Sequence, residues 1–518
     1  MFRNSKLIQA SVLVMVLSGL NKITGFVKLF LSTEAFGTGA DADAMAAAWQ
    51  LPDVFFVMVA GGTMAAALIP VYSGTLVNRD KEYQQKLANT VLTTIAIILG
   101  AMCITAAIFA PWLTRVVIVP DFAPEQQLLT ANLMRVALLG IFLFGLSSIL
   151  VSILHSHQHF LAPALGAVLF DSGFVIGLWL GADTYGVYAM VWGGVFGIVM
   201  HLVAQLFMIR RYNLSLWPAL DFSIPEVREI LHLLWPRLVV LVSLESVDIV
   251  IVRLASSLPE GSTSAWFFAN LLINMPIDLF GWSLVVTFFP TLSEKYNSEN
   301  IDSLHRSLEA GLRYLWFLII PSFVGLIALG PAGVSVLMER GEFTADSTML
   351  VYSLLVIAAS GAICFISYEV LSMLFLARHN TFYPMVIQLS SIVLSIGATY
   401  AFVGPWGIYG LASGRLVYTA AIMLAVWLAY RWLFEPLNEK FLAQEFIRSL
   451  VAAGAMALAI RLVAQIDMNQ LIFVVLAVPL GVLVYGAVHY FSGSNTLPEI
   501  LQAIQDRRRV GEEVGSGQ

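Results

Sequence analysis

"APWLTRVVIVPDFAPEQ", residues 110–126, and "GPAGVSVLMERGEFTADS", residues 330–347, are two versions of one pattern, and each follows a long apolar segment. Four pairs of residues repeat at an offset of 220 or 221 positions: Pro70 with Pro290, Pro111 with Pro331, Phe122 with Phe343, and Pro163 with Pro384. This nearly constant offset predicts a duplication of six helices. One copy would span residues 1–220 and the other residues 221–434.

The composition places the repeat in a membrane. Of 518 residues, 59% are hydrophobic and 12% are charged, with a mean hydropathy of +0.84, whereas soluble domains are roughly 25% charged. We therefore predict an all-α polytopic membrane protein. Its fourteen expected transmembrane helices lie near residues 7–33, 44–73, 87–110, 127–154, 160–182, 186–209, 227–257, 263–291, 308–337, 347–377, 382–403, 407–432, 446–465 and 470–491. The net charge of −6 gives no electrostatic footprint for a nucleic acid.

The repeat also predicts the arrangement of the helices. Six is an even number, so both copies enter the membrane from the same face and are related by an axis along its normal. Two such lobes would enclose a central cleft, with the last two helices, within 435–495, added outside the repeat. Residues 496–518 are expected to form a cytoplasmic amphipathic tail on anionic lipid, with Leu497, Ile500, Leu501 and Ile504 on its apolar side. Lys and Arg concentrate on the side of the N-terminus, which predicts that both termini are cytoplasmic.

Two lysines interrupt the first apolar segment, in "LNKITGFVKLF", residues 20–30. A Lys at the centre of a transmembrane helix costs about 2.5–3.5 kcal/mol on insertion scales, so both are expected to face protein or water. Asn21 and Lys28 share a helical face, because side chains seven positions apart point in one direction. Lys28, six residues before Glu34, could alternatively extend to the outer surface. Lys22 lies near the middle of the segment, which favours a polar side facing the cleft.

Further polar residues fall in the seventh and eighth segments. Asn270, Asn274 and Asp278 follow one another at spacings of four, beside Pro276. Glu245 and Asp248, three apart, are neighbours on one helix. Ionisable groups at this depth are candidates for coupling to a proton or a monovalent cation. The alternative is internal ion pairing, Asp248 with Arg253 or Arg135 with Asp171.

Signals for enzymatic chemistry are weak. The three histidines of "HSHQH", residues 155–159, have the two-residue spacing of an extended metal site, but a solvated loop is the default interpretation. No Ser-His-Asp set, P-loop or glycine fingerprint appears, and no hydrophilic loop is long enough for a catalytic domain. We therefore predict a protein that is not an enzyme and that has no catalytic residue, no metal site and no resident cofactor.

Several motifs together resemble one family, the MurJ/MviN lipid II flippases. "LNKITGFVK" is similar to the first-helix signature of that family, "FGTGADADA" to its first periplasmic turn, "QLPD" to its second-helix Leu-Pro-Asn, and "ERGEFTADST" to its loop between helices nine and ten. The resemblance implies the two-lobe fold of the MOP superfamily, with helices thirteen and fourteen forming a groove for a lipid tail. It also implies that Lys22, Lys28 and Asp43 line the cavity.

The sequence departs from the family pattern where cavity charges are expected. Phe56 and Val57 stand where family members usually have two arginines, and Gly61 replaces an acid. Asn270 and Leu271 replace the family's Asp-Arg in helix eight. Three cavity arginines are thus absent, so a diphosphate would meet fewer positive charges.

The sequence as a whole predicts a flippase of a polyprenyl-diphosphate-linked sugar in the bacterial inner membrane, working by alternating access. The substrate site would comprise Asn21, Lys22, Lys28, Asp43, Asn270 and Asn274, and the coupling site Glu245, Asp248 and Asp278. Expected partners are the lipid-linked sugar, membrane lipids and cell-wall synthesis proteins. The alternatives are a cation-coupled exporter of drugs or of other lipid-linked oligosaccharides in the same superfamily, and a transport-inactive scaffold.

Overall fold

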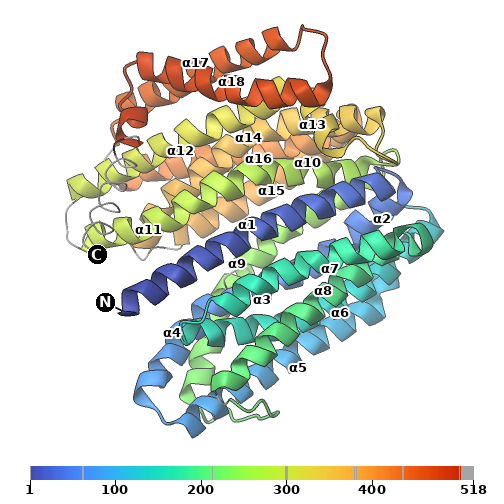
Figure 1. Cartoon of the computed structure of the whole chain (residues 1–518), viewed down its shortest axis with the longest axis vertical. Coiled ribbons are helices and arrows are strands. Elements are labelled where there is room, and N and C mark those ends of the chain that lie inside the picture. Colours follow the sequence, from blue (N-terminus) through green and yellow to red (C-terminus); the bar gives the residue numbers. More distant parts are fainter. Residues whose placement is uncertain are drawn as a thin grey trace. The chain divides into compact units, whose positions relative to one another are not determined.

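A computed structural model describes residues 2–60, 63–212, 214–297, 301–378, 380, 382–434, 437–500 and 502. All regular elements in these ranges are helices, as Figure 1 shows, which confirms the predicted all-α class. The chain divides into two compact units. Unit 1 comprises Met1–Ser264 and Met338–Ser347, and unit 2 comprises Ala265–Leu337 and Thr348–Gln518.

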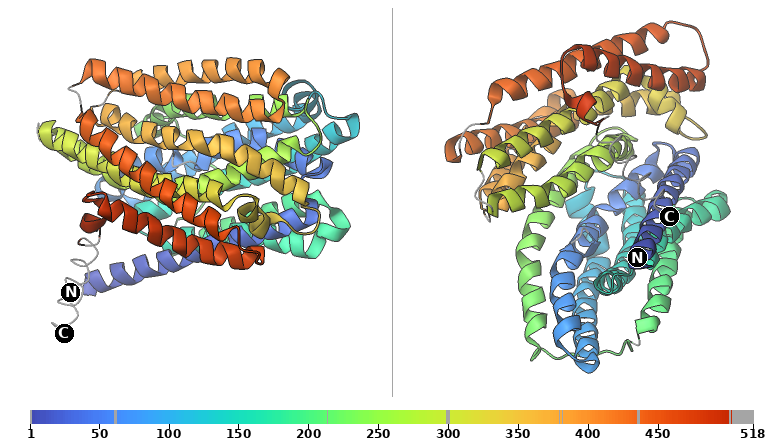
Figure 2. Two further views of the ribbon diagram at one scale, coloured as in Figure 1. Left: turned by 90° about the horizontal axis from the view of Figure 1, so that it is seen from above. Right: turned by 60° about the vertical axis from the view of Figure 1, so that its left-hand side comes forward.

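Unit 1 is built mainly from nine α-helices. They are α1 (Phe2–Phe36), α2 (Ala40–Ala48), α3 (Gln50–Ala60), α4 (Thr63–Asn78), α5 (Lys81–Leu113), α6 (Pro124–Ser156), α7 (Leu161–Tyr185), α8 (Val187–Ile209) and α9 (Pro225–Ala255), with a π-helical turn η1 (Thr114–Ile118) and a 3₁₀ turn η2 (Arg210–Tyr212). α6 packs against α5 and α8, and these helices lie side by side in Figures 1 and 2. α1 packs along α7, and α9 packs on α3 and α4.

Unit 2 holds the remaining helices. They are α10 (Ser262–Pro276), the π-helical turn η3 (Ile277–Gly281), α11 (Trp282–Asn297), α12 (Ile301–Leu329), α13 (Pro331–Met338), α14 (Ala345–Ala377), α15 (Phe382–Trp406), α16 (Ile408–Leu433), α17 (Glu439–Val463) and α18 (Gln470–Phe491). α10 begins, and α13 ends, at the border with unit 1. α17 and α18 pack together and on α12.

Within the residues that the structure describes, twelve helical segments are long and apolar enough to cross a membrane. The two other predicted spans fall in α1 and α9, which have 35 and 31 residues and carry several charged side chains. The predicted second span is not one helix, because α2 ends before Trp49 and α3 starts at Gln50. Similarly, the predicted ninth span ends at Leu329, and α13 starts beyond Gly330. Pro276 is followed by η3, so the helix break expected there takes the form of a π-helical turn.

Helices 221 positions apart have matching geometry. α6 and α14 both have 33 residues and start at Pro124 and Ala345. α7 and α15 both have 25 residues. The corners that follow them, Gly186 and Gly407, have φ of +54° in both cases. This parallel supports the proposed duplication, although the compact units divide at Ser264 and not near residue 220, since α9 packs within unit 1.

Two of the motifs quoted above meet at one end of α1. The Glu342 amide donates to the Glu34 carbonyl at 3.0 Å, and the hydroxyls of Thr38 and Ser347 are 2.7 Å apart. The backbones pass so closely that a Cβ on Gly341 would lie 2.2 Å from the Glu34 oxygen. A Cβ on Gly37 would lie 2.1 Å from the Glu342 oxygen. These contacts explain why residues 338–347 belong to unit 1.

Candidate functional site in the first helix

The first-helix lysine Lys28 is paired within unit 1. Its ammonium lies 2.7 Å from the Asp171 carboxylate on α7 and 4.9 Å from the centre of the Phe174 ring, one helical turn further along α7. The two paired side chains are 29% and 13% exposed. The Asn21 amide, oriented to satisfy its neighbours, donates to Asp171 Oδ2 at 3.3 Å and to the Ala167 carbonyl at 2.8 Å. The face shared by Asn21 and Lys28 therefore packs on α7.

Lys22 is placed differently. Its side chain is exposed, and it has no hydrogen bond or ion pair to any residue that the structure describes. Around it, Leu20, Ile23 and Phe26 are also exposed. Of the two lysines, Lys28 is thus paired with a carboxylate, whereas the side chain of Lys22 is exposed.

Asp43 is bound into a turn. This residue is only 2% exposed. One carboxylate oxygen accepts a hydrogen bond from the Gly261 amide at 2.8 Å, and the other accepts from the amide and hydroxyl of Ser264 at 2.7 and 2.6 Å. These donors lie at the start of α10, where the first backbone amides of a helix have no partner within it. Asp43 thus joins α2, which follows α1 after a short turn, to the start of α10. Its role in the structure is to fix this connection.

Three carboxylates gather where α3 and α9 pack. Glu245 and Asp248 are half-buried on α9, and both lie close enough to Asp53 on α3 to interact with its charge. The spacing of three residues pointed to the α9 pair but not to Asp53, although Asp53 ends the motif "QLPD". In the described parts of the chain, no group of three His, Cys, Asp or Glu residues is arranged to hold a metal ion.

The predicted ion pair between Arg135 and Asp171 is not observed, because each of these residues has other partners. Asp171 pairs with Lys28, whereas the Arg135 guanidinium donates to Asn132 and to the Ala107 carbonyl, each at 3.0 Å. Arg253, the other predicted partner of an acid, donates to the backbone carbonyls of residues 116 and 117.

The remaining predicted site residues lie in unit 2. Asn270 is half-buried and donates within its own helix to the Trp266 carbonyl at 3.1 Å. Asn274 and Asp278 are exposed, on α10 and on η3. In the predicted histidine loop, the ring of His157 stacks on Tyr212 at 4.3 Å between centroids.

The comparisons with known proteins identify the family. The model of the family "Lipid II flippase MurJ" matches residues 32–482. The chain belongs to the MurJ family. A relative from Bdellovibrio bacteriovorus, named "Probable lipid II flippase MurJ", is 24% identical over 480 residues, which cover 90% of this chain and 91% of the relative.

Solved structures agree with the fold of the MurJ family. A lipid II flippase MurJ in an inward closed conformation matches with a TM-score of 0.78 at 22% identity, covering 92% of this chain and 98% of that one. An inward-facing multidrug transporter of the MATE family, also in the MOP superfamily, matches with a TM-score of 0.67 at 14% identity over 83% of this chain and 98% of that one. These likenesses confirm the MOP-type fold that the resemblance implied.

The departures from the MurJ family pattern also have structural counterparts. Phe56, at a position where the family usually has arginine, packs its ring against Phe144 at 4.9 Å between centroids. It thus contributes to an apolar contact in unit 1, where the family pattern would provide a cation. Gly61 lies outside the described residues.

Proposed function

We propose that this chain, as a member of the MurJ family, moves lipid II or a closely related polyprenyl-diphosphate-linked sugar from the cytoplasmic to the outer leaflet by alternating access. The observation that carries the proposal is the exposed ammonium of Lys22 on α1, beside a Lys28 already neutralised by Asp171. A diphosphate needs a cation at membrane depth, and a lysine recognises phosphate as a point charge. In the proposal, Asn21, Lys28 and Asp43 hold α1 in place while Lys22 contacts the head group. Asn270 and Asn274 supply polar contacts to the sugar.

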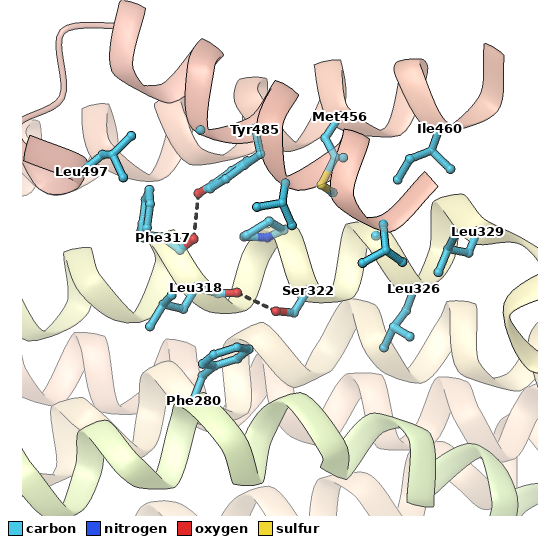
Figure 3. Close-up of a pocket in the computed structure, with 16 residues that line it drawn as sticks. Phe280, Phe317, Leu318, Ser322, Leu326, Leu329, Met456, Ile460, Tyr485 and Leu497 are labelled. Carbon is cyan, nitrogen blue, oxygen red and sulfur yellow. Dashed lines mark hydrogen bonds between the residues drawn. The ribbon is translucent and has the colours of Figure 1, made fainter. Parts of the chain in front are cut away.

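An apolar pocket in unit 2 is consistent with a substrate that has a long hydrocarbon tail. Its volume is about 530 Å³, and nearly all of its lining is apolar. Figure 3 shows it between α12, which contributes Phe317 and Leu326, and the two last helices, which contribute Met456, Ile460 and Tyr485. This is the place where the family resemblance implies a groove for the lipid tail. We assign the polyprenyl chain of the substrate to this pocket, since burying methylene groups is favourable at about 0.8 kcal/mol each.

The coupling ion is assigned to carboxylates. Glu245 and Asp248, together with Asp53, form a group whose mutual repulsion a proton or a monovalent cation would relieve. Asp278 on η3 is a second, separate candidate. The half-buried position of the α9 pair, close to Asp53, supports this role, because ionisable groups at membrane depth are candidates for coupling to a proton or a cation.

The protein is a multi-pass membrane protein of a family of inner-membrane transporters. We propose that both termini are cytoplasmic, from the distribution of Lys and Arg. Cell-wall synthesis proteins are the proposed partners beside the lipid substrate. The family match supports lipid II transport over multidrug export or an inactive scaffold, and an exposed lysine on α1 would repel a cationic drug.

Binding of a labelled polyprenyl-diphosphate sugar to the purified chain tests the proposal. Lys22→Ala should weaken binding by roughly tenfold, because one charge-assisted contact contributes about 1.5–3 kcal/mol. Lys81→Ala is the matched control, since this exposed lysine lies at the start of α5, outside the proposed site. An equal affinity of wild type and Lys22→Ala would remove Lys22 from the site. Failure of the wild type to bind the sugar lipid would refute the proposed substrate.

A further inference from the structure

The chain does not leave the membrane domain directly after its last long helix. Beyond α18 it turns at Gly493, whose φ is +77°, and residues 496–500 form a short helical turn. Residues 493–499, here called the clasp, connect to α17 and to α12, the two helices that line the pocket together with α18. The amphipathic pattern of residues 496–518 predicted Leu497 on the lipid-facing side of a tail. In the structure, Leu497 is one of the residues that line the pocket.

The first attachment of the clasp is to α17. Glu445 is only 3% exposed, and its carboxylate accepts hydrogen bonds from Ser494 at 2.7 Å and from Thr496 at 3.4 Å. Arg448, one turn along α17, completes the set of donors. A buried carboxylate is stable only when it is paired and hydrogen-bonded. Glu445 therefore holds Ser494 and Thr496 in place.

The second attachment is to α12. Glu499 accepts a hydrogen bond from the Tyr314 hydroxyl at 2.6 Å and forms an ion pair with Arg313. The Arg313 side chain is only 11% exposed, and its guanidinium also lies 4.9 Å from the centre of the Tyr314 ring. The two attachments lie on either side of Leu497 in the sequence. The position of Leu497 is thus fixed from both directions.

Leu497 lies at one end of the pocket. Figure 3 shows its side chain beside Phe317 and Tyr485, with Leu329 and Ile460 at the opposite end. The Tyr485 hydroxyl donates to the Phe317 carbonyl at 2.8 Å, which joins α18 to α12 at the same end. Phe317 and Leu329 are twelve positions apart on α12, or roughly 18 Å along the helix.

We propose that Leu497 is the end stop of the pocket and limits how much of a polyprenyl chain the pocket takes. This inference rests on the proposed function, which assigns the hydrocarbon tail of the substrate to the pocket. A chain longer than the space between Leu329 and Leu497 has to leave the pocket sideways into the bilayer. The clasp sets this limit because it holds the Leu497 side chain at this end of the pocket.

The test compares a short and a long polyprenol, farnesol and undecaprenol, in competition for the purified full-length chain. Leu497→Ala should raise the affinity for undecaprenol relative to farnesol by about fourfold for each methylene newly buried. Leu497→Trp should lower this ratio. Glu499→Gln, which removes the charge that Arg313 pairs with, should shift the ratio in the same direction as Leu497→Ala. Melting temperatures establish that each variant is folded.

Leu483→Trp is the matched control. This leucine is on α18, is 71% exposed and does not line the pocket, so the ratio should equal that of the wild type. An unchanged ratio in both Leu497 variants overturns the end stop. Because polyprenols carry no diphosphate, this result is independent of Lys22. A shifted ratio in a chain that binds no sugar lipid would refute the proposed substrate alone, and an unshifted ratio in a chain that binds it would refute the end stop alone.

Discussion

The ion pair between Lys28 and Asp171 allows a quantitative prediction. At 2.7 Å, two unit charges attract by about 6 kcal/mol at an effective dielectric constant of 20. Desolvation of both groups offsets part of this attraction, and the partial exposure of Lys28 weakens it further. Removal of one partner leaves the other charge uncompensated, so we expect Asp171→Asn or Lys28→Gln alone to cost roughly 3 kcal/mol. At roughly 2 °C per kcal/mol for a unit of this size, each lowers Tm by about 6 °C.

The double variant distinguishes a coupled pair from two independent contributions. With both charges removed, neither is left unpaired, so the combined loss of Tm should be close to that of one single variant. The assay is thermal unfolding in detergent micelles, with Arg135→Gln as the control, because this exposed guanidinium does not contact Asp171. Losses that add up in the double variant, with a coupling below about 0.5 kcal/mol, would refute the pairing.

Two further predictions concern the loops of unit 1. Gly341→Ala places a Cβ against the Glu34 oxygen at a residue with φ of +54°. The free energy of unfolding should therefore fall by more than the cost of about 1–2 kcal/mol that the left-handed conformation alone imposes on a non-glycine residue. Thermal unfolding measures this loss, and an unchanged Tm would contradict the close approach at Gly37 and Gly341. The hydrogen bond from Lys86 lowers the pKa of Asp221 to about 2. This contact therefore stabilises the loop above about pH 4 and is lost as the pH falls toward 2. Limited proteolysis of residues 214–224 should increase over that range, and Asp221→Asn should abolish this dependence of the cleavage rate on pH.

The helices could be predicted from the sequence because their signals are local. The apolar segments predicted at residues 127–154 and 160–182 begin and end within a few residues of α6 and α7. Pro124 and Pro225 stand in the first turns of α6 and α9, where a missing amide costs nothing. The spacing of Asn21 and Lys28 correctly put both on one face of α1, since helical geometry alone determines that.

The partners across helices could not be predicted in the same way. Asp171 is 143 positions from Lys28, and nothing in a local pattern states that α1 packs on α7. Charge matching within apolar runs allowed Arg135 as an equally good partner, and only the packing decided between them. Similarly, the family motif containing Asp43 was recognisable, but its burial depends on a turn at residues 261–264, far away in the sequence.

The charge balance around α1 bears on how the substrate can be held. The family resemblance places several cations in the cavity, whereas here Lys28 is neutralised by Asp171 and Phe56 packs against an aromatic ring. In the proposed function, the exposed Lys22 attracts a diphosphate without fixing its orientation, because an ammonium lacks the paired donors of arginine. If the proposed function holds, we expect a larger share of the affinity to come from the hydrocarbon chain, whose contacts are insensitive to salt. We therefore expect substitutions in the pocket lined by Leu497 to weaken binding of the proposed substrate more than the removal of any single charge on α1 does.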